Sequence, residues 1–139
     1  MTGDIDFGSG GAARLRLELL GYEHPDVAEP DGLDLIAVRA HATASPVEAA
    51  FDLELAVYEL RELADYLTEI NSGNGPAKSF DLAGGLLSLS FAPSRRGPIL
   101  CAVRHKNIDA AHLRIEYLVT LEPSDVTRCV TQLRSTLST

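Results

Sequence analysis

The chain has 139 residues, 45% of them hydrophobic, and a formal net charge of −8 with a pI near 4.8. This length suits one domain and the hydrophobic content supports a globular core, which excludes a globally disordered chain. The acidic balance disfavours a nucleic-acid partner, and no apolar run approaches the ~20 residues of a membrane helix, so no membrane partner is expected. Residues 1–6 lack the basic and apolar regions of a signal peptide, which predicts a cytoplasmic protein.

The acidic charge is concentrated in the first half of the chain. Residues 1–71 contain fifteen Asp and Glu against four Arg, a balance of −11. Residues 72–139 contain five acids against eight Lys and Arg, a balance of +3. Such a surface would attract a basic protein and speed their encounter. The simpler interpretation is that acidic side chains keep the protein soluble, and both interpretations stay open.

The chain opens with a glycine-rich segment. We expect residues 1–12 to be flexible and residues 13–139 to form a single α+β domain. Leucines alternate with charged side chains over residues 13–20, which predicts a first strand. Residues 21–32 contain two prolines and an Asp-Gly pair and therefore predict a loop.

Two further strands are expected at residues 33–43 and 47–55. The Ser45-Pro46 turn between them is so short that it implies an antiparallel hairpin. Outward positions of these strands and of the first one carry charges of both signs, which predicts weak cross-strand ion pairs. The outward charged residues are Arg14, Arg16, Arg39, Glu48, Asp52 and Glu54.

The hydrophobic period changes from two to 3.6 after residue 55. Apolar residues recur at helical spacing over residues 60–70, and acidic residues occupy the opposite side. Asn71-Ser72-Gly73 then ends the helix, because Asn and Gly tolerate the left-handed conformation. A strand and a helix that each have one apolar side must share a core.

The second half of the chain predicts four strands and a closing helix. The strands are expected at residues 77–82, 86–92, 99–103 and 112–121, and the helix at 122–137. Gly84-Gly85 predicts a tight hairpin, and residues 104–107 predict a basic turn. The order βββαββββα lacks the alternating pattern of a parallel sheet. We expect an α+β fold with two helices on one face of a curved, mainly antiparallel sheet of about seven strands.

No motif for catalysis, cofactor binding or metal binding is found, and no cofactor is expected. Cys101 and Cys129 are expected to be buried, reduced thiols rather than a disulfide or a zinc site. Cys101 and His105 lie ~13 Å apart along a strand, so a nucleophilic pair would need a fold that brings them together. Asp52 and Glu54 share one outward face and could act as a glycosidase pair, but paired carboxylates also occur on any solvated sheet.

Acidic residues of the loop at 23–34 and of the first helix form the candidate binding surface. The loop lacks EF-hand spacing, so docking of a basic protein is favoured over calcium binding. Tyr66 lies near the border between the apolar and acidic sides of the helix, where it could anchor an interface or cover the edge of the core. The candidate partner-binding residues are Glu23, Asp26, Glu29, Asp31, Glu59, Glu62, Asp65 and Tyr66.

Four segments also follow an order of elements and a hydrophobic spacing that occur together in a known type of protein. They are Leu-Asp-Leu-Ile-Ala-Val at residues 33–38, the three strands that run into Leu60-Arg61-Glu62-Leu63, the Gly75-Pro76-Ala77 turn with its hairpin, and the helix over 121–137. In these segments the chain resembles the WapI-like immunity proteins, a family of small bacterial antitoxins. The resemblance implies a non-catalytic protein that binds and neutralises a cognate toxin, often a nuclease. An acidic first half would suit a basic toxin.

Two other functions stay open. A small-molecule binder or weak enzyme would use the concave side of the sheet, with Asp52, Glu54 or His41 in a deep pocket. A self-associating domain would pair exposed strand edges into a homodimer.

Overall fold

The structure is a computed structural model, and four strands followed by a helix occur twice in it. The described residues are 2–8, 11–23, 34–73, 75–94, 97–106 and 113–138. Their strands are β1 (Gly3–Phe7), β2 (Ala13–Tyr22), β3 (Leu35–Ala44), β4 (Val47–Ala56), β5 (Lys78–Leu82), β6 (Leu87–Ala92), β7 (Ile99–Lys106) and β8 (Arg114–Leu121). The helices are α1 (Val57–Asn71) and α2 (Pro123–Leu137), and a 3-10 turn, η1, spans Ala83–Gly85.

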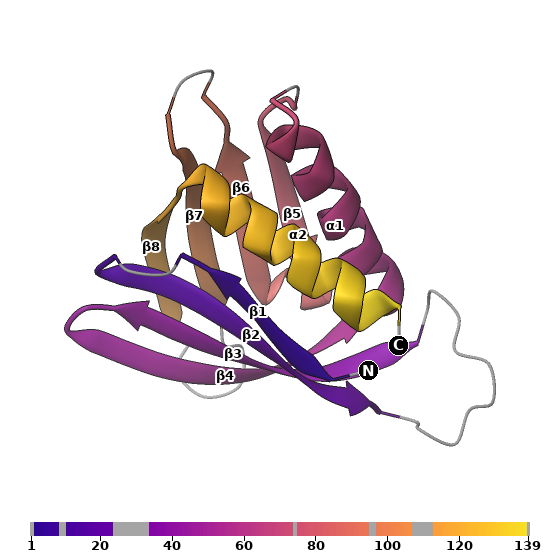
Figure 1. Cartoon of the computed structure of the whole chain (residues 1–139). Coiled ribbons are helices and arrows are strands. Elements are labelled where there is room, and N and C mark those ends of the chain that lie inside the picture. The colour runs from indigo at the N-terminus through magenta and orange to yellow at the C-terminus, as the bar shows by residue number, and fades with distance from the viewer. Residues whose placement is uncertain are drawn as a thin grey trace.

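The strands form two four-stranded sheets. Sheet A has the order β1-β2-β3-β4 and sheet B the order β5-β6-β7-β8. Every neighbouring pair is antiparallel. The two sheets stand at an angle to each other, and both helices lie in that angle (Figure 1). α1 continues directly from β4, and α2 packs on α1 and β1, so the helices close the space between the sheets.

This architecture confirms the α+β class and the antiparallel pairing that the sequence predicts. It differs from the expectation in two respects: the described strands number eight rather than seven, and they form two sheets rather than one. Hydrophobic periodicity locates a strand and its buried face but does not identify the neighbouring strand. Because β4 runs into α1 without a break, β4 and β5 do not pair, and a second sheet begins at β5.

The additional strand, β1, lies within the segment that the sequence predicts to be flexible. Ile5 and Phe7 are fully buried, whereas Asp4 of the same strand is exposed. Gly8 directly after the strand has a φ of 84° and lies so close to β8 that a Cβ atom would come within 2.9 Å of a Val119 methyl carbon. Glycine is therefore required here by a close approach of the two sheets rather than by chain flexibility.

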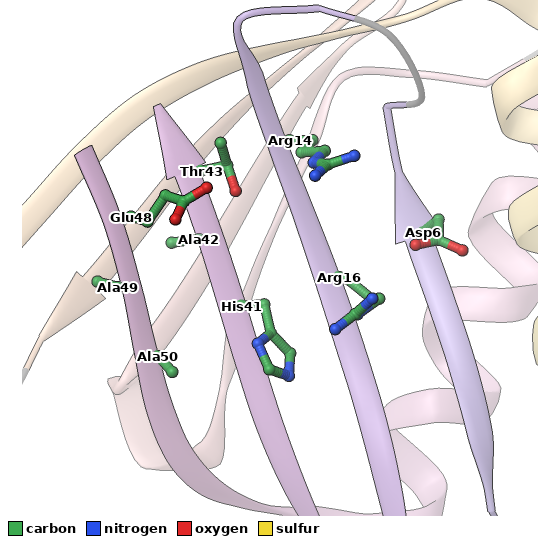
Figure 2. Close-up of a pocket in the computed structure, with 9 residues that line it drawn as sticks. All are labelled: Asp6, Arg14, Arg16, His41, Ala42, Thr43, Glu48, Ala49 and Ala50. Carbon is green, nitrogen blue, oxygen red and sulfur yellow. The ribbon is translucent and has the colours of Figure 1, made fainter. Parts of the chain in front are cut away.

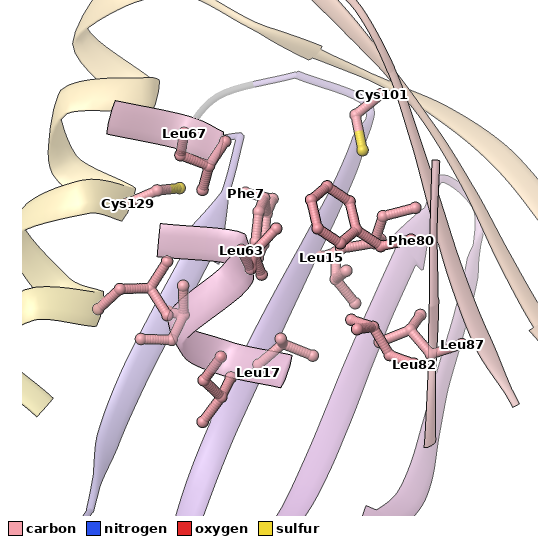
Figure 3. Close-up of a cluster of buried hydrophobic side chains, with 14 of the residues drawn as sticks. Phe7, Leu15, Leu17, Leu63, Leu67, Phe80, Leu82, Leu87, Cys101 and Cys129 are labelled. Atoms are coloured by element: carbon pink, nitrogen blue, oxygen red, sulfur yellow. The ribbon is translucent and has the colours of Figure 1, made fainter. Parts of the chain in front are cut away.

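α1 is the element around which the core assembles. Its buried residues include Val57, Leu60, Leu63, Leu67 and Ile70. Figure 3 shows Leu63 and Leu67 among side chains of both sheets, with Cys129 of α2 on the other side of the helix. Each fully buried leucine contributes about 1.5–3 kcal/mol relative to an exposed one. The predicted sharing of a core by the β4 strand and this helix is confirmed.

The hairpin of β5 and β6 turns at η1, as the glycine pair predicts. Gly84 and Gly85 have φ angles of 67° and 92°, a region that other residues rarely adopt. Leu82 is paired with Leu87 across the hairpin, and both side chains are buried. Both leucines therefore lie on the inward face of the hairpin.

Residues 104–106, which the sequence predicts to lie in a basic turn, belong to β7. β7 extends to Lys106, and Arg104 and Lys106 are paired with Glu116 and Arg114 of β8. His105 between them is buried. The predicted end of this strand falls too early, because residues 104–106 are all polar. Buried and exposed positions nevertheless continue to alternate through these residues.

Candidate partner-binding surface

The outer face of sheet A carries the predicted mosaic of charges. Arg39 Nε lies 3.0 Å from Asp52 Oδ1, and His41 Nε2 lies 3.0 Å from Glu18 Oε1. The hydrogen bond to Asp52 raises the pKa of Arg39, and the hydrogen bond with His41 lowers the pKa of Glu18. All four side chains join adjacent strands, so part of the acidic charge on this face is neutralised within the protein.

A hollow crosses the same face from β1 to β4 (Figure 2). Arg14 and Arg16 of β2 lie on one side of it, and the small residues Ala49 and Ala50 of β4 lie on the other. The carboxylate of Asp6 accepts a hydrogen bond from Gln132 Nε2 at 3.1 Å. The lining therefore mixes charges of both signs.

Glu23 is the predicted loop residue that the structure describes. It lies directly after β2, is exposed, and its backbone N–H donates to Leu35 O at 3.0 Å. It lines a second hollow together with Asp52 and Glu59, so two of the predicted residues, Glu23 and Glu59, are brought together. The other predicted loop residues, Asp26, Glu29 and Asp31, lie outside the described residues.

Glu59 has structural contacts at the start of α1. Its Oε1 accepts the backbone N–H of Ala56 at 3.1 Å, and its Oε2 accepts the backbone N–H of Ala83 at 3.0 Å. An acidic side chain in the first turn also complements the helix dipole. The carboxylate is half-buried and already accepts two backbone donors, which limits what it can offer a partner.

The remaining predicted helix residues divide into an exposed pair and a buried tyrosine. Glu62 and Asp65 are exposed, and Asp65 Oδ1 accepts a hydrogen bond from an Arg134 guanidinium nitrogen at 2.9 Å. Tyr66 is 3% exposed, and its hydroxyl donates to Pro76 O at 2.6 Å. Tyr66 thus lies at the edge of the core, the alternative that the sequence left open.

The candidate nucleophile pair lies inside the core. Cys101 and His105 both point inward from β7, and burial raises the pKa of the Cys101 thiol to about 12. The Cys129 thiol donates to Asp6 O at 2.7 Å, and both cysteines are free and buried. A protonated thiol is a poor nucleophile, so this pair supports packing rather than catalysis. Within the described ranges, no cluster of three or more His, Cys, Asp or Glu residues could hold a metal ion.

Sequence analysis missed an aromatic stack around His105 that joins the two sheets. The His105 ring lies 4.7 Å from the Phe51 ring of β4 and 5.6 Å from the Tyr117 ring of β8, measured between centroids. His105 Nε2 and the Tyr117 hydroxyl are 2.8 Å apart. Burial lowers the pKa of His105 to about 4, so the imidazole is neutral at pH 7. The alternation of residues 99–103, continued by two positions, was the signal for this burial.

Comparison with known proteins bears directly on the family. The model of the Immunity protein WapI-like family matches residues 5–139, which is nearly the whole chain. No curated protein and no solved structure matches this chain. In the part of the chain that the structure describes, neither fifteen-residue helix is long and apolar enough to cross a bilayer. The resemblance that the order of elements indicated is confirmed, and the chain belongs to the WapI-like immunity protein family.

Proposed function

We propose that this protein neutralises a basic toxin by binding it through acidic side chains of the first half of the chain. Family membership over residues 5–139 is the observation that supports toxin neutralisation. Proteins of an immunity family typically bind their toxin rather than catalyse a reaction. A nuclease is the candidate toxin, because an enzyme that acts on a phosphate backbone needs basic groups at its surface.

The acidic docking surface is proposed on charge and exposure. Residues 1–71 carry a balance of −11, and Glu23, Glu62 and Asp65 are exposed. Asp26, Glu29 and Asp31 belong to the same proposal through their place in the sequence. An acidic surface speeds encounter with a basic partner and makes binding sensitive to salt.

The test uses the toxin domain that we expect a neighbouring gene to encode, produced together with this chain in bacteria. The wild-type protein should restore growth, and the dissociation constant should rise as the salt concentration is raised. Glu62→Lys combined with Glu23→Lys should weaken binding at least tenfold at low salt, mainly through slower association.

Glu116→Lys combined with Asp81→Lys is the matched control, because it makes the same total change of charge at two exposed positions of sheet B. It should leave binding close to that of the wild type. Equal effects of the two changes would contradict the acidic docking surface. Failure of the wild-type protein to restore growth would contradict neutralisation of that toxin.

A further inference from the structure

The hydrogen bonds of sheet A determine which backbone groups of β4 face away from the sheet. The N–H of Glu23 donates to Leu35 O, which directs the backbone of Leu35 toward β2. Backbone groups alternate in direction along an antiparallel strand. Leu35 is paired with Ala56, so the even-numbered residues of β4 direct N–H and C=O away from β3. The bond from Ala56 N–H to Glu59 agrees with this assignment.

Three residues of this edge lack a partner strand. β4 is the last strand of sheet A and is paired with β3 alone. Within the residues that the structure describes, no hydrogen-bond partner lies on the outer edge of β4 for the backbone of Glu48, Ala50 and Asp52. A row of unpaired N–H and C=O groups is a template for another strand.

The side chains beside this edge have alternating character. Glu48, Ala50 and Asp52 are exposed on the outer face of sheet A. On the inner face, Val47 is 53% exposed and Phe51 is half-buried. The small residues at positions 49 and 50 leave space at the end of the hollow in Figure 2. An added strand would therefore meet acids on one face and apolar groups on the other.

The charges beside this edge indicate whether a second copy of this chain or a different partner would pair with it. If two copies of β4 paired at this edge, Glu48 and Asp52 of one copy would face the same acids of the other. Like charges opposite each other destabilise a strand pair, whereas Lys or Arg opposite Asp or Glu stabilises it. The edge therefore disfavours self-pairing and favours a basic strand.

We propose that the outer edge of β4 binds an extended segment of the toxin, added as an antiparallel strand in which basic and apolar residues alternate. This mode of contact rests on the proposed function for its choice of partner. In an antiparallel pair, residues directly opposite each other share a face, and every second opposite pair exchanges hydrogen bonds. At this edge the bonded pairs are those that contain Glu48, Ala50 and Asp52, because their backbone groups face outward. The basic residues of the segment thus lie opposite Glu48, Ala50 and Asp52 and supply the backbone bonds, while its apolar residues lie on the side of Val47 and Phe51.

The test uses a synthetic heptapeptide, Lys-Val-Lys-Val-Lys-Val-Lys, and two methylated forms of it. Methyl groups on the backbone nitrogens of the internal lysines remove donors that face β4. Methyl groups on the valine nitrogens remove donors that face away and leave composition and charge unchanged. We expect the lysine-methylated peptide to bind at least tenfold more weakly than the valine-methylated one. The amide resonances of Glu48, Ala50 and Asp52 should shift with the unmethylated peptide.

A variant of the protein supplies the second measurement. Ala50→Pro removes one N–H from the outer edge and none from the ladder with β3, and proline is tolerated on edge strands. It should weaken binding of the unmethylated peptide several-fold, whereas Ala50→Ser should not. Circular dichroism and thermal unfolding confirm that both variants are folded.

Three outcomes overturn the proposal: no binding of the unmethylated peptide, equal binding of the two methylated peptides, or shifts confined to Glu62 and Asp65 of α1. No toxin is used in this experiment, so its failure is distinct from failure of the growth test. If the peptide binds the edge but no toxin is neutralised, the edge site stands and the proposed toxin is wrong.

Discussion

The two edges of sheet A are built differently. At the β1 edge, the Asp6 N–H donates to Gln132 Oε1 at 2.8 Å, and Asp6 O accepts from the Cys129 thiol at 2.7 Å. Both partners belong to α2, so a helix of the same chain satisfies the edge. At the β4 edge, the described residues supply no such partners for the backbone groups of Glu48, Ala50 and Asp52.

This difference shows two ways in which one sheet avoids uncontrolled association. Covering an edge with a helix satisfies its backbone groups and adds buried surface. Placing charges beside an edge leaves it accessible but selects the charge of any strand that can join it. The first edge therefore contributes to stability, and the second is the edge at which we propose that the toxin strand is recognised.

The largest expected difference between the edges is in side-chain burial. Phe7→Ala on β1 should lower the free energy of unfolding by about 3–5 kcal/mol, because the ring is fully buried. Phe51→Ala on β4 should cost less, since Phe51 is half-buried. Urea unfolding of both variants measures this. Equal losses in the free energy of unfolding would mean that the Phe51 side chain contributes as much to the core as the Phe7 side chain.

The hydrogen bonds of Gln132 between α2 and β1 can be removed with one substitution. Gln132→Ala leaves the N–H of Asp6 without its acceptor and should cost about 1–3 kcal/mol in urea unfolding. Thr131→Ala, at an exposed position of the same helix, is the control and should change stability by less than about 0.5 kcal/mol. A small loss in both variants would show that the β1 edge does not depend on α2.

The β4 side of the sheet should respond to pH through His105. Its folded pKa of about 4 lies below the ordinary value of 6.5, so the unfolded chain binds the proton more readily. The stability that depends on neutral His105 is complete above pH 6.5 and falls as the pH drops toward 4. We expect a loss of about 2 kcal/mol between pH 7 and pH 5 from this residue. The loss should be absent from His105→Gln, compared by urea unfolding at both pH values.

The smallest expected effect is at the exposed edge itself. Ala50→Thr should change the free energy of unfolding by less than about 0.5 kcal/mol, because this side chain is exposed and borders no other strand on that side. Thermal and urea unfolding both measure it. A loss above 1 kcal/mol would indicate that the edge of β4 is packed against another part of the chain.

Most of the fold could be predicted because alternation and helical spacing are local properties of the sequence. The hairpin at Gly84 and the apolar face of α1 are examples. β1 was missed although Ile5 and Phe7 alternate with acids, since the flanking glycines outweighed two periods of alternation. The division into two sheets was missed because it depends on the absence of pairing between β4 and β5, which no local pattern records.

The candidate binding surface was less predictable, because acidic residues that are free to meet a partner and acidic residues that are hydrogen-bonded within the protein have the same sequence pattern. Glu59 and Glu62 both lie on the polar side of α1, but Glu59 accepts a hydrogen bond from Ala83, which lies 24 residues away. Tyr66 likewise reaches Pro76 across the end of the helix. Such contacts follow from tertiary structure, so charge alone could suggest a candidate surface but could not show which of its acids are already bonded within the protein.

The contacts of Glu59 also give the proposed strand site a direction. The Ala56 N–H is the last donor on the outer side of β4, and the Glu59 carboxylate occupies it while also holding Ala83 of the next hairpin. One end of the site is thus closed by the protein's own side chain, and the Val47 end is open. A visiting segment meets a fixed stop at the helix end, which limits how far it can extend along β4 in that direction whatever its side chains are.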